Sequence, residues 1–387
     1  MERKAQESTF ATQNERSGLP KYVHLPETKH ELEYADLAML DLSEFDRPGG
    51  KEKLAEQLRA AAHHSGITST YQIGTSANSS GFFYITNFGL TQAEIDEQFA
   101  IAKAFFALPQ EERLKYRAPL EEGNYNGYRP LGTLEILPGL YDNVEFYNIF
   151  KFIPQTQRVQ PDIFREYWGE IEKFHRHMHE NVSFKLLRLL AISLELPEEE
   201  LVNGHLYEAN CDSSLRYMMY RARSSEENNS YKDLYLRGHT DIGTMTFVFQ
   251  QPVAALQIKH TESSHWQHIR IPPGVIAVNL ADILQFLTNG YLKSGIHRVI
   301  SPPEDQASND RLGLLYFLRP AEQLMLRALD SPYLRKMGYG NEGTAVDPDV
   351  PASDWVRERV RKNWTRSPED NTQSVKMGGF KAKIIYD

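Results

Sequence analysis

The segment Val278-Asn-Leu-Ala-Asp-Ile-Leu-Gln-Phe-Leu-Thr-Asn-Gly-Tyr-Leu-Lys-Ser-Gly-Ile-His-Arg-Val299 leads into a histidine, His297, that begins a predicted strand. The apolar run Gly274–Leu280 enters the segment as a strand, and Asn289-Gly290 marks a turn inside it. A histidine placed after such a turn is a candidate metal ligand if further ligands come from elsewhere in the chain.

A second short motif, Gly238-His239-Thr240-Asp241, stands just before another predicted strand, Thr244–Phe249. In extended backbone, residues i and i+2 point to the same side, so His239 and Asp241 can both face one ion. With His297 they supply two imidazoles and one carboxylate, which leaves coordination positions open for a co-substrate and dioxygen. This donor set is typical of non-haem Fe(II), although the His-x-Asp pattern alone is common and weak.

Arg311 begins the apolar run Leu312–Leu318, which predicts a buried strand. A buried arginine is costly unless it is paired with a fixed anion. A guanidinium can bind a carboxylate through two parallel hydrogen bonds, so Arg311 is a candidate anion-binding residue. The alternative is a surface salt bridge close to its neighbour Asp310.

These motifs resemble the 2-oxoglutarate-dependent Fe(II) oxygenases of the isopenicillin-N-synthase-like group, from about Ala35 to Pro320. The matching segments are Gly81–Asn87, Gly238–Thr244, Leu256–Ile258, Pro273-Gly274 and Val278–Val299. The resemblance implies a double-stranded β-helix (jelly roll) with iron bound by His239, Asp241 and His297. It also implies that Arg311 pairs with the distal carboxylate of 2-oxoglutarate, and it names no catalytic residue beyond the metal ligands.

Tyr220 falls where the resembling family has a tyrosine near the co-substrate, although a core aromatic on a strand explains it equally well. Two departures stand out. The family usually has Arg-x-Ser, whereas this chain has Arg311-Leu312-Gly313. The missing hydroxyl would cost about 1 kcal/mol of co-substrate binding unless a water or Tyr220 replaces it. The loop Ser65–Ser80 is also longer than expected.

On the substrate side, the stretch Gly123–Arg129 resembles the pocket-lining segment of the family, so Tyr128 and Arg129 are candidate substrate residues. Asn148 is a third candidate. Loop packing accounts for each of them equally well.

The alternating histidines His175, His177 and His179 are not predicted to form a metal site. Alternate residues of a helix point about 200° apart, so the three cannot share one ion. A solvated helix face is expected there instead.

The order of patterns predicts an α+β fold: helices, then a block of β, then helices. Residues 1–35 are expected to form an N-terminal arm and 36–205 a mainly helical region that packs on the core. Residues 206–320 are expected to form the Fe(II)/2-oxoglutarate jelly-roll core, and 321–387 a helical extension that serves as a lid or a dimer contact. Local patterns predict a strand at Leu37–Leu42, helices at Lys51–His64, Pro161–Leu196 and Asp354–Trp364, and a capping box at Thr91–Glu94.

Composition fits a globular enzyme of 387 residues with a formal net charge of −9, which does not favour a nucleic-acid partner. The single cysteine, Cys211, fits a reducing compartment. No apolar run approaches the ~18 residues of a membrane span, and the N-terminus has no secretory pattern. We therefore expect a cytoplasmic monomer or homodimer without membrane or nucleic-acid partners.

The resemblance implies a dioxygenase that uses Fe(II), 2-oxoglutarate and O2 to oxidise an unactivated C–H bond of a small-molecule metabolite. Hydroxylation, desaturation or cyclisation are possible outcomes, and secondary metabolite biosynthesis is the expected setting. One alternative is an Fe(II) oxidase of the same fold that does not use 2-oxoglutarate. Others are a catalytically silent jelly-roll binding protein and a zinc hydrolase, although no general-base Glu stands at helical spacing beside the histidines.

Overall fold

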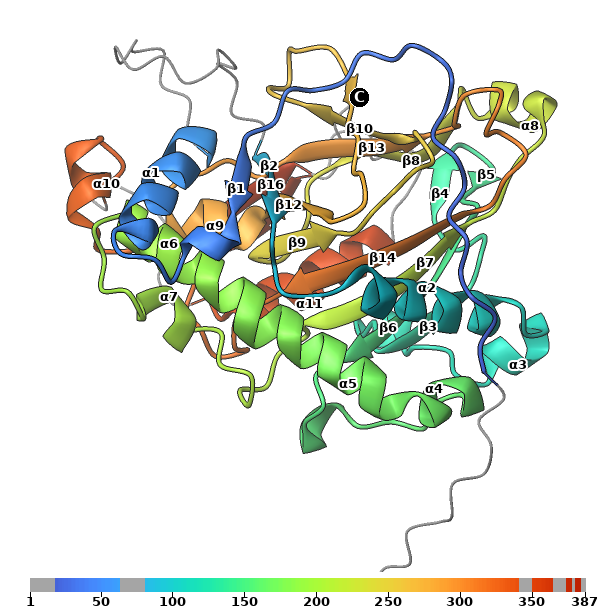
Figure 1. Ribbon diagram of the computed structural model, residues 1–387, viewed down its shortest axis with the longest axis horizontal. Helices are drawn as coiled ribbons and strands as arrows, with labels where there is room; N and C mark the ends of the chain where they lie inside the picture. The colour runs from blue at the N-terminus through green and yellow to red at the C-terminus, as the bar shows by residue number, and fades with distance from the viewer. Residues whose placement is uncertain (1–17, 63–80, 341–349, 365–373, 378–379, 384–387) are drawn as a thin grey trace, which may run out of the picture.

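Two β-sheets pack face to face at the centre of the molecule (Figure 1). The computed structural model describes residues 18–62, 81–340, 350–364, 374–377 and 380–383. The major sheet has eight strands in the order β1-β2-β12-β9-β14-β7-β6-β3. Their bounds are β1 Met39–Asp41, β2 Phe82–Thr86, β3 Gly127–Arg129, β6 Val144–Phe150, β7 Ser214–Tyr220, β9 Met245–Val248, β12 Val275–Leu280 and β14 Arg311–Leu318.

The minor sheet has four strands in the order β11-β10-β13-β8. They are β8 Leu234–His239, β10 Leu256–Lys259, β11 Gln267–His268 and β13 Ile296–Ile300. Two separate hairpins, β4 (Glu135–Leu137) with β5 (Leu140–Tyr141) and β15 (Ser374–Met377) with β16 (Phe380–Lys383), lie outside both sheets. Helices around two facing, mainly antiparallel sheets make an α+β jelly roll, as the sequence predicts.

Strand β14 shows how the sequence sorts its side chains between two cores. Leu312, Leu314, Tyr316 and Leu318 face the helices, whereas Arg311, Gly313, Leu315 and Phe317 face the space between the sheets. The alternation follows from the period of two in extended backbone. The inner face of this strand therefore carries an arginine and a glycine that a purely apolar core would not need.

Helices cover the outer face of the major sheet (Figure 1). The longer helices of the described residues are α1 Gly50–Ala62, α2 Gln92–Phe106, α5 Trp168–Arg176, α6 Phe184–Ser193 and α11 Ala352–Trp364, of which the first four contribute to this helix-side core. The shorter ones are α3 Gln110–Leu114, α4 Asp162–Glu166, α7 Glu200–Asn203, α8 Ser225–Ser230, α9 Asp282–Leu287 and α10 Pro332–Lys336, with 3-10 turns at Leu42–Glu44, Leu120–Glu122 and Pro154–Thr156. No helix among the described residues combines the length and apolarity needed to cross a bilayer.

The predicted capping box begins α2: the Thr91 side chain accepts from the Glu94 backbone, and the Glu94 carboxylate accepts from the Thr91 backbone. The predicted strands and helices are present within a few residues of their expected bounds, so these predictions are confirmed. The loop Ser65–Ser80 lies outside the described residues.

The prediction of a solvated face at the alternating histidines is wrong. His175 and His179 are 0% exposed, and His179 bonds Tyr316 and the carbonyl of His205. Residues His177–Ser183 form a π-helical segment, whose wider turn departs from the spacing assumed for an α-helix. Burial holds the pKa of His175 and His179 well below the ordinary value, so they are neutral core residues.

The major sheet contains strands from both sides of residue 205. β1, β2, β3 and β6 come before this residue, and β7, β9, β12 and β14 come after it. The described part of the N-terminal segment, residues 18–38, runs along the outside of the core before β1 (Figure 1). Its side chains bond distant elements, as His24 does with Asp96 and Glu27 with Arg270.

Helix α11 packs against α9. Trp355 is 0% exposed and meets Phe286 edge-on at a centroid distance of 4.9 Å. Val356 and Val360 complete this small core, and Arg359 lies 3.9 Å from the buried carboxylate of Asp282. The helix therefore forms one wall of the region that contains His239 and Asp241.

Candidate active site

The minor sheet brings the three predicted metal ligands together. β8 ends at His239, and β13 pairs with it so that His297 is directly opposite His239. Asp241 follows in the turn after β8. Its Oδ1 lies 4.0 Å from Nε2 of His239 and 3.9 Å from Nε2 of His297. One ligand atom from each residue lies within 4.8 Å of the others, a spacing that one metal ion can bridge.

Backbone carbonyls orient both imidazoles. Nδ1 of His239 donates to the carbonyl of Arg237 at 2.8 Å, and Nδ1 of His297 donates to the carbonyl of Gly295 at 3.1 Å. A carbonyl can only accept, so the proton sits on Nδ1 and the lone pair of each Nε2 is free toward Asp241. Burial, together with nearby His297, lowers the pKa of His239 to about 3, which keeps this imidazole neutral.

The carboxylate of Asp241 is held by a neighbouring amide. Asn279 on β12 donates from Nδ2 to Oδ2 of Asp241 at 2.8 Å, which leaves Oδ1 facing the histidines. Burial would raise the pKa of Asp241, but the nearby His297 and His239 and the hydrogen bond from Asn279 lower it below its ordinary value. The group is thus a carboxylate, the form that binds metal.

Gly295 allows β12 and β13 to approach at this point. A Cβ there would stand 2.1 Å from Oδ1 of Asn279 and 2.5 Å from Cε2 of Phe82. A side chain at this position would displace the amide that holds Asp241. Gly295, in the segment Val278–Val299, therefore leaves room for the Asn279 amide that holds Asp241.

Arg311 is buried on the inner face of β14, opposite Tyr220 of β7. The alternative of a salt bridge to Asp310 is wrong, because Asp310 binds Arg221 at 2.7 Å. Among the described residues no carboxylate pairs with Arg311, and its buried Nε has no hydrogen-bond partner. Burial lowers the pKa of Arg311, so a bound anion would offset an unfavourable desolvation.

Tyr220 and Gln251 lie beside Arg311 in the cavity that also contains the three ligands. The guanidinium carbon of Arg311 is 5.3 Å from the Tyr220 ring centroid. The Gln251 amide donates to the Leu312 carbonyl at 2.9 Å, and its Nε2 lies 3.4 Å from the place of a Cβ at Gly313. The Gln251 amide therefore places a hydrogen-bond donor next to Gly313, the position at which the family usually has a serine.

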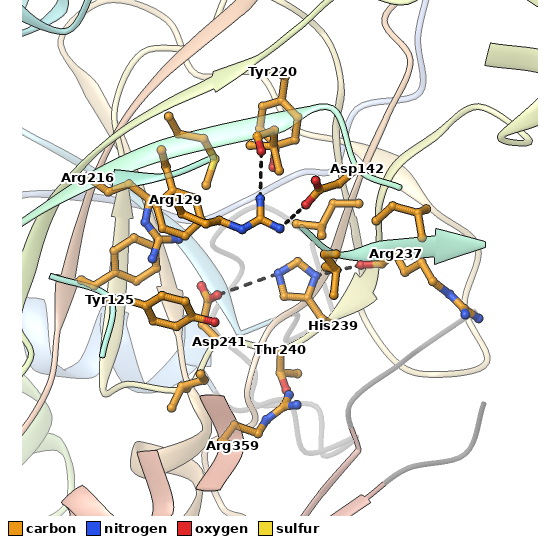
Figure 2. A pocket seen from close by; sticks show the side chains of 18 of the residues that line it. Tyr125, Arg129, Asp142, Arg216, Tyr220, Arg237, His239, Thr240, Asp241 and Arg359 are labelled. Atoms are coloured by element: carbon orange, nitrogen blue, oxygen red, sulfur yellow. Dashed lines mark hydrogen bonds and ion pairs between the residues drawn. The ribbon is translucent and has the colours of Figure 1, made fainter. Parts of the chain in front are cut away.

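A wider cavity of about 170 Å³ opens on the other side of the triad (Figure 2). Arg129 lines it but forms a buried ion pair with Asp142. Asn148 is buried and accepts from Nε of Arg216 at 2.7 Å, and Arg216 itself lines the cavity. Tyr128 points elsewhere: it bonds Glu145 and packs in the helix-side core.

Two family models match this chain: "non-haem dioxygenase in morphine synthesis N-terminal" over residues 68–170 and "2OG-Fe(II) oxygenase superfamily" over residues 209–320. The chain belongs to the 2OG-Fe(II) oxygenase superfamily. It is a 2-oxoglutarate-dependent dioxygenase that requires Fe(II), 2-oxoglutarate and O2, as the sequence predicts. The alternatives of an oxidase without 2-oxoglutarate and a silent binding protein are correspondingly disfavoured.

Similar proteins have the same family character. The dioxygenase is 29% identical over 288 residues to UPF0676 protein C1494.01 of Schizosaccharomyces pombe, covering 72% of this chain and 84% of that protein. It is 26% identical over 294 residues to a 2-oxoglutarate-dependent dioxygenase of Didymella fabae, covering 72% and 87%. Its fold matches a full-length Neurospora crassa protein, solved in complex with alpha-KG, with a TM-score of 0.68, 21% identity and coverage of 84% and 95%.

Sequence reasoning missed three residues of this oxygenase site: Arg216, Gln251 and Asn279. Arg216 shares the inner face of β7 with Tyr220, four residues later, so the strand period could have found it. Asn279 lies in the segment Val278–Val299, but its contact with Asp241 depends on how β12 approaches the turn after β8. Gln251 follows β9 and reaches Gly313 only through the pairing of β9 with β14.

Proposed function

We propose that His239, Asp241 and His297 bind the Fe(II) of this dioxygenase. The observation that carries the proposal is the convergence of two oriented Nε2 atoms and one carboxylate oxygen within 4.8 Å. Two histidines and one carboxylate on one side of an ion leave the positions that a co-substrate and dioxygen need. Asn279 is a positioning residue that holds Asp241.

Arg311 binds the distal carboxylate of 2-oxoglutarate in this proposal. Support comes from its burial, its unpartnered Nε and its place in the same cavity as the three ligands. Tyr220 lines the same end of the cavity, and the Gln251 amide supplies a donor where Gly313 lacks a hydroxyl. The missing serine is therefore compensated, and 2-oxoglutarate use does not depend on it.

When bound, the iron and 2-oxoglutarate supply the oxidising chemistry, converting 2-oxoglutarate and O2 to succinate and CO2 while a substrate C–H bond is oxidised. The chain itself positions these groups. Arg311 orients 2-oxoglutarate by two-point binding of its far carboxylate. Apolar side chains on the inner faces of β7, β9 and β14, such as Met218, Val248 and Leu315, exclude water from the reacting end.

The substrate of this oxygenase is a small molecule, and we propose a metabolite oxidised by hydroxylation, desaturation or cyclisation in secondary metabolite biosynthesis. Arg129 lines the substrate cavity in this proposal, and Asn148 holds Arg216, which also lines it. We further propose a cytoplasmic monomer or homodimer that does not bind nucleic acid, consistent with the net charge of −9 and the single, buried cysteine. Residues 206–320 carry every proposed iron and 2-oxoglutarate contact.

Succinate release tests the proposal. The purified full chain with Fe(II), 2-oxoglutarate and O2 is expected to release succinate, slowly without substrate and faster with one. Arg311→Met is expected to lose this release at moderate 2-oxoglutarate while keeping iron. Equal succinate release by wild type and Arg311→Met across the whole 2-oxoglutarate titration would contradict the assignment of Arg311.

A further inference from the structure

A second guanidinium, that of the half-buried Arg216 on β7, faces the active-site cavities. Arg216 lines both the cavity that contains Arg311 and the wider cavity beyond the triad. Among the described residues no carboxylate pairs with it, and its one hydrogen bond is from Nε to Oδ1 of Asn148 at 2.7 Å. A cation so placed is costly unless an anion joins it.

The free edge of Arg216 has a defined direction. Asn148 is held in place because its Nδ2 donates to the carbonyl of Tyr125 at 2.9 Å. With Nε occupied by Asn148, the guanidinium presents Nη1 and Nη2 side by side. This is one of the two edges through which a guanidinium binds a carboxylate with two parallel hydrogen bonds.

Two aromatic rings confine the guanidinium. Its carbon lies 4.0 Å from the ring centroid of Phe146 and 4.2 Å from that of Phe317. Both distances fit cation–π contact. A side chain held by two rings and one amide loses little further freedom when it binds a ligand, which favours affinity.

Arg216 and Arg311 stand at different ends of the site. Arg311 is opposite Tyr220 and Leu315 is opposite Arg216 on the paired strands β14 and β7. Four residues of strand separate Tyr220 from Arg216, which is about 13 Å. In the proposed function 2-oxoglutarate lies between the metal site and Arg311, at the end of this stretch of strand that is away from the backbone of Arg216.

The surrounding charges leave Arg216 unneutralised. Asp142 pairs with Arg129, Glu135 accepts a hydrogen bond from the backbone of Gly139, and Asp241 is the proposed metal ligand. Arg319 also lines the wider cavity and adds positive charge, with Asp212 as its partner at 3.3 Å. Figure 2 shows Arg216 beside Tyr125 and Asp241 on the wall of this cavity.

We propose that Arg216 binds a carboxylate of the substrate, so that the substrate of this dioxygenase is an organic acid with an apolar body. The proposal rests on the proposed function, because it places the acid next to the iron site. The apolar body would contact Leu134, Ile136 and Val144.

Matched pairs of probes test this inference without turnover. The full chain, loaded anaerobically with Fe(II) and 2-oxoglutarate, is titrated by calorimetry with benzoate, phenylacetate and 4-phenylbutyrate and with their primary carboxamides. At least one carboxylate is expected to bind at least about 10-fold more tightly than its amide, the effect of a charge-assisted bidentate pair. No such preference in any of the three pairs would overturn the proposal.

Variants locate the preference. Arg216→Gln is expected to abolish it, and Arg216→Lys to retain part of it. Arg270→Gln, an exposed arginine paired with Glu27, is the matched control and keeps it in full. Retention of the preference by Arg216→Gln would overturn the proposal, and if that variant does not fold, the same comparison is made with Arg216→Lys and Asn148→Leu, which frees Nε.

The same titrations separate this inference from the proposed function. Arg216→Gln is expected to keep the affinity for 2-oxoglutarate within about threefold, whereas Arg311→Met is expected to lose it. Loss of 2-oxoglutarate binding by Arg216→Gln would make Arg216 a co-substrate residue and overturn the inference alone. Unchanged 2-oxoglutarate binding by Arg311→Met would contradict the proposed function and leave the carboxylate preference to be judged by itself.

Discussion

Asn279 donates a hydrogen bond to Oδ2 of Asp241 at 2.8 Å, and so turns the other carboxylate oxygen toward His239 and His297. Groups that orient metal ligands typically contribute 10- to 100-fold to metal affinity. Asn279→Ala is therefore expected to weaken Fe(II) binding by about 10- to 100-fold. Anaerobic titration with Fe(II) measures this affinity, and Asn181→Ala, at an exposed position, serves as the control. Equal Fe(II) affinity in Asn279→Ala and wild type would show that Asn279 does not orient the ligand.

Arg311 offers a second prediction. Removing one partner of a buried charge pair costs about 2–5 kcal/mol. Arg311→Met is expected to raise the KM for 2-oxoglutarate by at least about 30-fold, with iron content unchanged. Arg311→Lys should recover only part of this loss, because an ammonium cannot reproduce the two-point contact. Steady-state kinetics against 2-oxoglutarate give the answer, and a KM within a few-fold of wild type would exclude this role.

Gln251 is expected to replace the hydroxyl that Gly313 lacks. Gln251→Leu should raise the KM for 2-oxoglutarate about fivefold, the effect of one neutral hydrogen bond of about 1 kcal/mol. Gly313→Ser in this variant should restore part of the affinity, because the nearest atoms to a Cβ there are 3.4 Å away. Steady-state kinetics of the single and double variants measure these KM values. A wild-type KM for 2-oxoglutarate in Gln251→Leu would show that Gln251 does not replace the hydroxyl missing at Gly313.

Trp355 anchors α11 to the core and offers a stability prediction. It is 0% exposed and packs against Phe286. Trp355→Ala is expected to lower the free energy of unfolding by about 3–5 kcal/mol, because it leaves a large cavity. Denaturant unfolding measures it, and Val159→Ala, at a 72% exposed position, serves as control. A loss under about 1 kcal/mol would mean that α11 does not contribute to the folded core.

Local patterns in the sequence predicted much of the fold. The period-two runs around Thr244–Phe249 and Leu312–Leu318, and the Thr91–Glu94 capping box, depend on neighbours along the chain. For the same reason the meeting of His239 and Asp241 could be expected from their spacing. Arg311 could be expected to be buried because an apolar strand follows it.

What the sequence could not predict depends on contacts between distant strands. Asn279 reaches Asp241, and Gln251 reaches Gly313, only after the strands have paired. Tyr128 was expected near the substrate, but its strand turns it toward Glu145. His175 and His179 were expected on a solvated helix face, whereas the face that carries them is buried.

Anaerobic Fe(II) titration of the full chain tests the central claim most directly. Wild type is expected to bind one equivalent of Fe(II), and His239→Ala, Asp241→Ala and His297→Ala are each expected to lose this binding while remaining folded. His177→Ala, a histidine that bonds the carbonyl of Phe88 far from the triad, should bind as wild type does. Undiminished binding of one equivalent by Asp241→Ala or by either ligand-histidine variant would contradict the account.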